Sequence, residues 1–211
     1  MKRITILFVF LGAFIVVAYG KTESFGTWIE LEFRKDFLER FAFSLSPEIR
    51  LQDRFNPDRF LLQGQLSFQP VSLIELAASY RVETERKTGG NVAASRYAFD
   101  AHIKKDLSRF EVAFRGRLTN YSEEKEDDYE TFLRPRVKIE YDIKGSKIKP
   151  YVSCELFHNA IRKETQKLRY DVGFTRKIGG PHRIGGYLRL NDYFTEKASI
   201  YIVGIGYRLR L

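Results

Sequence analysis

Cysteine, methionine and long apolar runs are scarce in this sequence of 211 residues. Cys154 is the only cysteine, which excludes an intrachain disulfide framework. After Val17 no apolar run approaches the roughly eighteen residues that a membrane-spanning helix requires. If the chain crosses a membrane, it must therefore do so as a closed barrel, because only a barrel then pairs every backbone N–H and C=O group.

The N-terminus has the three parts of a secretory signal. Two basic residues precede an apolar run from Ile4 to Val17, and Ala18-Tyr19-Gly20 supplies small residues with the spacing of a cleavage site. As a helix the run would rise about 21 Å, short of the roughly 30 Å hydrocarbon core, which disfavours a membrane anchor. We expect residues 1–20 to be a signal peptide and residues 21–211 to form one exported domain.

Charge is abundant but evenly spread. Charged residues make up 30% of the chain and the formal net charge is +9. The lysines and arginines recur at every second position without a basic cluster or a stacking motif, so we expect no nucleic-acid partner. We expect anionic lipid head groups to be the counter-charge.

From Trp28 onward, apolar and polar residues alternate with a period of two. This pattern is typical of strands with one apolar face. We count eleven such runs of about twelve residues, joined by short connections that alternate with longer or more charged ones, as in a transmembrane barrel. The expected connections include a tight turn at Lys144-Gly145-Ser146 and longer loops at Thr84 to Asn91 and His158 to Lys167. The prediction is an all-β, antiparallel up-and-down transmembrane β-barrel of about twelve strands, with ten as the alternative. Thr22 to Thr27 would supply the twelfth, and Pro47 and Pro135 would mark bulges.

The charged face of each run belongs inside the barrel, because a Lys or Arg facing mid-bilayer lipid costs on the order of 2–4 kcal/mol. Both signs are present, so we expect ion pairs to fill the lumen or to leave a narrow channel. Two consecutive runs should together form a cationic patch of Arg115, Arg117, Arg134 and Arg136. We expect this patch to be partly paired with Glu111, Glu140 or Glu155. The predicted lumen residues are Glu30, Glu32, Glu48, Arg50, Glu75, Arg81, Arg96, Asp100, Arg115, Arg117, Arg134, Arg136, Glu140, Glu155, Arg169, Asp171 and Arg189.

The last thirteen residues, Ser199 to Leu211, form one uninterrupted alternating run. This ending resembles the C-terminal insertion signal of bacterial outer-membrane barrels, although it finishes on leucine and not on an aromatic residue. The resemblance implies recognition by the barrel-assembly machinery, and we expect a monomer. The residues of this signal are Tyr201, Val203, Ile205, Tyr207, Leu209 and Leu211.

Several motifs stand out along the mature chain: Trp28, Pro47-Glu48-Ile49-Arg50, Arg134-Pro135-Arg136, Tyr151 to Phe157 with its Glu155, and the ending from Asp192-Tyr193-Phe194 to Tyr207. On these motifs the mature chain as a whole is similar to a family of small outer-membrane β-barrels of Gram-negative bacteria known as a domain of unknown function. The resemblance implies a barrel in the outer membrane and supplies no catalytic residues.

Two other classes of protein deserve comparison. An outer-membrane enzyme acting on lipid would need Ser, His and acid groups together, but alternation sends His158 to the face opposite Ser153 and Glu155. His102 should instead pair with Asp100, and His182 lies in a turn. We therefore expect no catalytic site, metal or cofactor.

A soluble exported lipocalin-like barrel that binds a small ligand is the other alternative. It is suggested by Gly26-Thr27-Trp28, a Gly-x-Trp on an early strand. A lipocalin has eight strands with the apolar face inward, whereas this chain has eleven runs and one densely charged face.

Overall fold

Strands account for most of the residues that the computed structural model describes, which are residues 22–52, 55–87, 90–123, 130–194 and 198–211. The predicted signal peptide, residues 1–20, lies outside this described part. The elements are β1 Thr22–Phe37, β2 Phe41–Gln52, β3 Asn56–Val71, β4 Ile74–Lys87, β5 Gly90–Leu107, β6 Phe110–Glu123, β7 Glu130–Tyr141, β8 Ile148–Asn159, β9 Glu164–Gly179, β10 His182–Tyr193 and β11 Ala198–Arg210.

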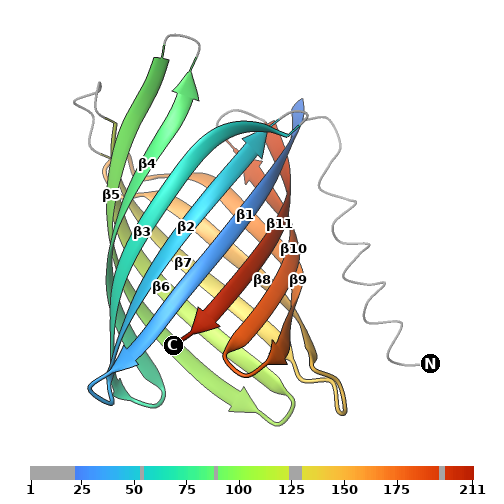
Figure 1. Ribbon diagram of the computed structural model, residues 1–211. Helices are drawn as coiled ribbons and strands as arrows, with labels where there is room; N and C mark the ends of the chain where they lie inside the picture. Colours follow the sequence, from blue (N-terminus) through green and yellow to red (C-terminus); the bar gives the residue numbers. More distant parts are fainter. Residues whose placement is uncertain (1–21, 53–54, 88–89, 124–129, 195–197) are drawn as a thin grey trace.

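These strands close into one barrel, which confirms the predicted all-β barrel class (Figure 1). Each strand pairs antiparallel with its successor, but β1 and β11 pair in parallel from Thr22↔Ala198 to Arg34↔Arg210. The described residues thus form eleven strands, and the residues expected to supply a twelfth open β1. With an odd number of strands the first and last run in the same direction, so parallel pairing is what removes the two sheet edges.

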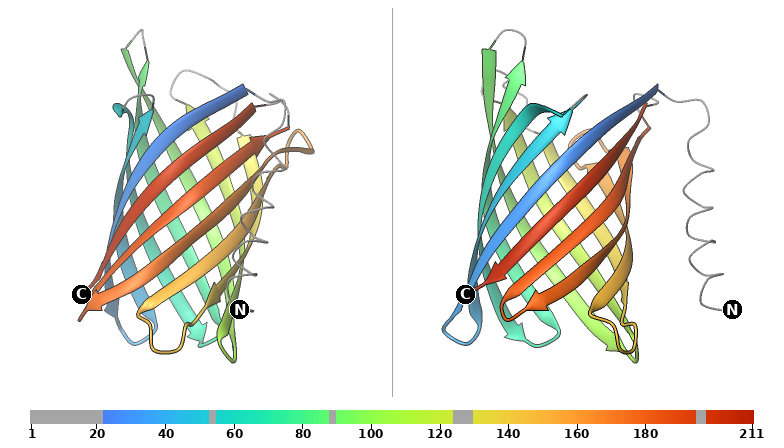
Figure 2. Two further views of the ribbon diagram at one scale, coloured as in Figure 1. Left: turned by 90° about the vertical axis from the view of Figure 1, so that its right-hand side faces the viewer. Right: turned by 45° about the vertical axis from the view of Figure 1, so that its right-hand side comes forward.

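The barrel has two rims, named here by the chain ends. The N-terminal rim holds the start of β1, and the C-terminal rim holds the end of β11. The strands cross the wall at a strong tilt between them (Figure 2). At the C-terminal rim the backbone N–H of Leu211 donates to the carbonyl of Arg34, which ties the end of the chain to β1.

Connection lengths do not alternate as expected, because several strands run further than the sequence pattern indicated. β4 continues to Lys87 and β5 begins at Gly90, so most of the predicted loop Thr84 to Asn91 is a hairpin that rises beyond the N-terminal rim (Figure 1). On the C-terminal rim, residues 142–147 form a longer connection than the predicted tight turn. Backbone pairing can extend through polar residues, so composition alone does not locate a strand end.

The two prolines interrupt pairing without producing the bulges that we expected. Pro47 stays in register with Leu62 on β3, while the ladder between β1 and β2 omits two pairs beside it. Pro135 similarly pairs with Gly116 on β6 and leaves a gap in the ladder toward β8. The pairs on either side of each gap keep one register, so each proline costs hydrogen bonds to one neighbour but adds no residue.

The two faces of the wall differ in chemistry. Large apolar side chains lie exposed on the outer face of every strand, from Phe25 on β1 to Ile205 on β11. The inner face carries buried charged side chains such as Glu48, Asp100 and Arg134. Within the described part of the chain, no helix has the length and apolar character needed to cross a membrane.

Candidate functional site in the lumen

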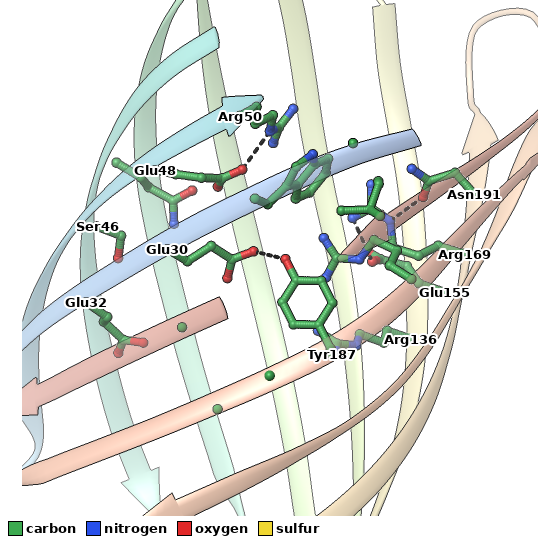
Figure 3. A pocket seen from close by; sticks show the side chains of 18 of the residues that line it. Glu30, Glu32, Ser46, Glu48, Arg50, Arg136, Glu155, Arg169, Tyr187 and Asn191 are labelled. Carbon is green, nitrogen blue, oxygen red and sulfur yellow. Dashed lines mark hydrogen bonds and ion pairs between the residues drawn. The ribbon is translucent and has the colours of Figure 1, made fainter. Parts of the chain in front are cut away.

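Side chains from all eleven strands surround a cavity of about 650 Å³ inside the barrel. Fourteen lysines and arginines line it, against six aspartates and glutamates. Figure 3 shows part of this lining, with Arg50 and Glu48 turned toward one another and Tyr187 reaching Glu30. The cavity is therefore polar and carries an excess of positive charge.

Two buried aspartates hold one arginine each in a bidentate pair. Arg117 donates from Nε and a terminal nitrogen to the two oxygens of Asp100, at 2.6 and 2.7 Å. Arg189 makes the same fork with Asp171, at 2.7 and 3.2 Å. In both cases the partners are directly opposite on neighbouring strands, which is why the side chains meet.

Glu155 is shared by three arginines. Arg134 donates to its carboxylate from Nε at 3.1 Å, and Arg115 donates to the same oxygen. Arg169 lies 3.7 Å from the other oxygen. Glu155 is only 2% exposed. This one buried carboxylate therefore partly neutralises the positive charge of three guanidinium groups.

Glu48 is a second shared carboxylate, on the β2 side of the lumen. Arg50 donates to it at 2.6 Å, and a terminal nitrogen of Arg81 lies 3.8 Å away. Arg81 also donates to the side-chain oxygen of Gln63. Arg96 lies 3.8 Å from Glu83 on the same side.

Of the predicted lumen residues, most line the cavity, with three exceptions. Asp100 and Asp171 bind arginines of the lining without lining it themselves, and Glu75 pairs with Arg34 at 3.0 Å. Glu155 is the partner of the cationic patch, whereas Glu111 pairs with Lys104 and Glu140 with Lys138. The register decides this, because neither of these two glutamates lies opposite an arginine of the patch.

Trp28, the only tryptophan, lies inside the lumen among guanidinium groups. Arg50 sits 3.9 Å from the centroid of its ring, and Arg189 and Arg169 lie at 4.8 and 5.6 Å. Cation–π attraction of this kind favours guanidinium groups close to the ring. In the sequence, Trp28 was interpreted only as part of a motif. Its position on the charged face of β1 could already have indicated that its side chain lies in the lumen.

Tyr187 lies flat against the inner wall because its neighbours on both sides are glycines. It is directly opposite Gly204 on β11 and Gly173 on β9. A Cβ at Gly204 would overlap the ring, and one at Gly173 would lie 2.8 Å from Tyr187 Cβ. The hydroxyl donates to Glu30 across the closing strands.

Lys167 belongs to the lumen and not to a loop, contrary to the predicted connection from His158 to Lys167. β9 begins at Glu164, and Lys167 lines the cavity. Its Nζ donates to Tyr193 Oη at 2.8 Å and lies 4.6 Å from the ring centroid of Phe157. The charged residues 162–164 suggested a longer loop, but the turn ends at residue 163, and pairing with β8 begins at Glu164.

The side chains considered for catalysis do not converge. His158 Nδ1 lies 3.3 Å from Thr165 Oγ1, while Ser153 donates to Asp171. His102 lies 3.9 Å from Asp100, and His182 contacts Tyr207. Cys154 is a free cysteine and is exposed. Among the described residues there is no group of three or more His, Cys, Asp or Glu side chains that could hold a metal ion.

The residues of the predicted insertion signal lie along β11 and just beyond it. Val203 and Ile205 are exposed at mid-strand, and Tyr201, Tyr207 and Leu209 are half-buried. Leu211 is exposed beyond the end of the strand. Recognition of this strand by the assembly machinery stays a prediction.

Comparison with known proteins gives one family. No curated protein matches the sequence. The family model described as protein of unknown function (DUF2490) matches residues 25–199, which covers most of β1, all of β2 to β10 and the start of β11. The chain therefore belongs to this family of proteins of unknown function.

Proposed function

We propose that the protein is an outer-membrane β-barrel with a structural or narrow-channel role and no enzymatic activity. The observation that carries the proposal is the contrast between the two faces of the wall. Every strand exposes at least one large apolar side chain outward, while the inner face holds the ion pairs. A closed barrel with this polarity suits lipid outside and a polar lumen inside.

The same contrast disfavours the lipocalin-like alternative. A lipocalin turns its apolar face inward around a small ligand. Here Val203 is 50% exposed and Ile205 is 58% exposed on the outer face of β11, whereas Glu155 is 2% exposed inside. Lipid is the solvent in which such a surface is stable, so outer-membrane lipids and lipopolysaccharide are its expected partners.

The ion pairs reduce the open width of the lumen. Arg115 on β6 reaches Glu155 on β8, and Arg34 on β1 reaches Glu75 on β4. Side chains held in this way leave little room for hydrated ions to pass. We therefore expect a small or absent conductance, and a monomer is sufficient for the proposed role.

The location is tested by expressing the full chain with its signal segment in a Gram-negative host. The expected result is recovery of the protein in the outer-membrane fraction and a shift in gel migration on boiling. Recovery in the soluble periplasm without such a shift would reject the proposal. In planar bilayers, a stable anion-selective current through the purified protein would reject the narrow lumen while leaving the location intact.

Charged substitutions on β11 test which face meets lipid. Tyr207→Asp with Leu209→Asp, or Val203→Asp with Ile205→Asp at mid-strand, should prevent assembly, because each variant places two charges on the lipid face of the closing strand. Such a charge costs about 2–4 kcal/mol for Lys or Arg at the membrane centre, less for Asp, and less again near the membrane surface. Leu38→Asp is the matched control, since Leu38 lies 76% exposed in the connection between β1 and β2. Normal membrane levels of both double variants would contradict the assignment.

A further inference from the structure

Two neighbouring arginines of the lumen keep a buried donor that nothing in the described protein satisfies. Arg115 on β6 and Arg136 on β7 are directly opposite in the strand register. The Nε atoms of both are buried and make no hydrogen bond within the described residues. An unpaired buried donor is costly, and more so when it is charged.

The nearby carboxylates are already shared among several donors, including terminal nitrogens of these two arginines. Arg136 donates to Asp171 at 3.4 Å, and Arg115 donates to Glu155. Both oxygens of Asp100 accept from Arg117, and both oxygens of Asp171 accept from Arg189. Glu155 accepts from Arg115 and Arg134 through one oxygen and has Arg169 beside the other. The protein therefore supplies too few acceptors for the guanidinium groups at this point.

The excess of cations extends along the cavity. Lys167 also lines it, and no described carboxylate lies within 4 Å of its Nζ. Like charges also face each other across strands, since Arg115 is opposite Arg136 and Arg117 is opposite Arg134. Such pairs repel unless an anion lies between them.

We propose that the lumen binds a small phosphate-type oxyanion from solution, held by the guanidinium groups of Arg115 and Arg136. A phosphate-type anion has several acceptor oxygens, and each planar guanidinium group can donate two parallel hydrogen bonds to them. Two arginines on neighbouring strands therefore match such an anion better than two lysine ammonium groups would. The cavity of about 650 Å³ has room for it beside the existing ion pairs. The inference rests on the charged lumen of the proposed function and not on the membrane location.

The test titrates inorganic phosphate into the purified, folded barrel in detergent micelles at constant ionic strength. Binding is followed by calorimetry and by the fluorescence of Trp28, the single tryptophan in the lumen. We expect phosphate to bind saturably, and we expect no such binding with chloride at the same concentration. Titration with micelles carrying phosphatidylglycerol separates a lipid head group from a free anion, and a response to the lipid alone would overturn the proposal.

Variants assign the site. Arg115→Gln with Arg136→Gln should weaken phosphate binding at least about tenfold, because each charge-assisted hydrogen bond contributes about 1.5–3 kcal/mol. Arg115→Lys with Arg136→Lys keeps the charge and should restore part of the affinity. Arg109→Gln, in the exposed connection between β5 and β6, is the matched control and should bind as the wild type does.

Folding of each variant is checked by far-ultraviolet circular dichroism in the same micelles, so loss of binding is scored only for folded protein. If the double glutamine variant does not fold, the double lysine variant alone tests the proposal. Its affinity for phosphate must then be lower than that of the wild type. Unchanged phosphate affinity in a folded double variant, or no saturable binding by the wild type, would overturn the proposal. Failure of the membrane location would leave these results unaffected.

Discussion

Two parts of the inner wall, called here the arginine wall and the glycine wall, contribute to the lumen in opposite ways. The arginine wall is the inner face of β6 and β7, with Arg115, Arg117, Arg134 and Arg136. The glycine wall is the inner face of β9 to β11, with Gly173, Gly185, Gly204 and Gly206. The first sends long side chains into the lumen, and the second offers bare backbone against which Tyr187 lies.

The two walls differ in what holds them together. Carboxylates on neighbouring strands hold the arginine wall, so its stability depends on charge balance. Steric fit holds the glycine wall, since the ring of Tyr187 occupies the space that a side chain at Gly204 would need. Substitutions should therefore fail for different reasons on the two walls.

The largest effect is expected on the arginine wall, from Glu155→Gln. This change keeps the volume but leaves Arg115, Arg134 and Arg169 without their shared carboxylate. Removing one partner of a buried ion pair typically lowers the free energy of unfolding by about 3–5 kcal/mol. Urea unfolding in lipid vesicles, followed by Trp28 fluorescence, measures the loss.

Arg134→Ala with Arg136→Ala serves as the comparison for Glu155→Gln. This pair should also lower the free energy of unfolding, but by less, because Glu155 keeps Arg115 and Arg169 and Asp171 keeps Arg189. An equal or greater loss in the double variant would show that positive charge is not in excess on this wall.

An intermediate effect is expected on the glycine wall, from Gly204→Val. The new side chain would overlap the ring of Tyr187 and force it off the wall. Overpacking of this kind costs about 1–3 kcal/mol, measured by the same unfolding experiment. Gly206→Ala is the matched control, since the nearest atom to its new Cβ would be the Glu30 carbonyl oxygen at 4.0 Å. Equal losses at both glycines would remove the steric explanation.

The smallest effect is expected from Tyr187→Phe. The ring would stay against Gly204, and only the hydrogen bond from the hydroxyl to Glu30 would be lost. The free energy of unfolding should fall by about 1 kcal/mol. A loss as large as that of Gly204→Val would mean that the hydrogen bond, and not the fit of the ring, keeps Tyr187 in place.

The residue pattern was sufficient to predict the barrel class and the two faces of its wall. In β6, for example, Phe114 and Leu118 alternate with Arg115 and Arg117, and the apolar pair is exposed while the arginines line the cavity. Alternation is a local property, because successive side chains of any strand point to opposite faces. Strand ends were less predictable, as Lys87 and Lys167 show, because backbone pairing continues through polar residues.

Which residues face inward therefore follows from the residue pattern alone, whereas their pairing and the closure of the barrel depend on contacts between strands. The parallel pairing of β1 with β11 depends on strands at opposite ends of the chain. The sharing of Glu155 by three arginines depends on the register of β6 to β9. The position of the Tyr187 ring depends on glycines from two other strands. Register is set by contacts between strands far apart in sequence, so no local pattern encodes it.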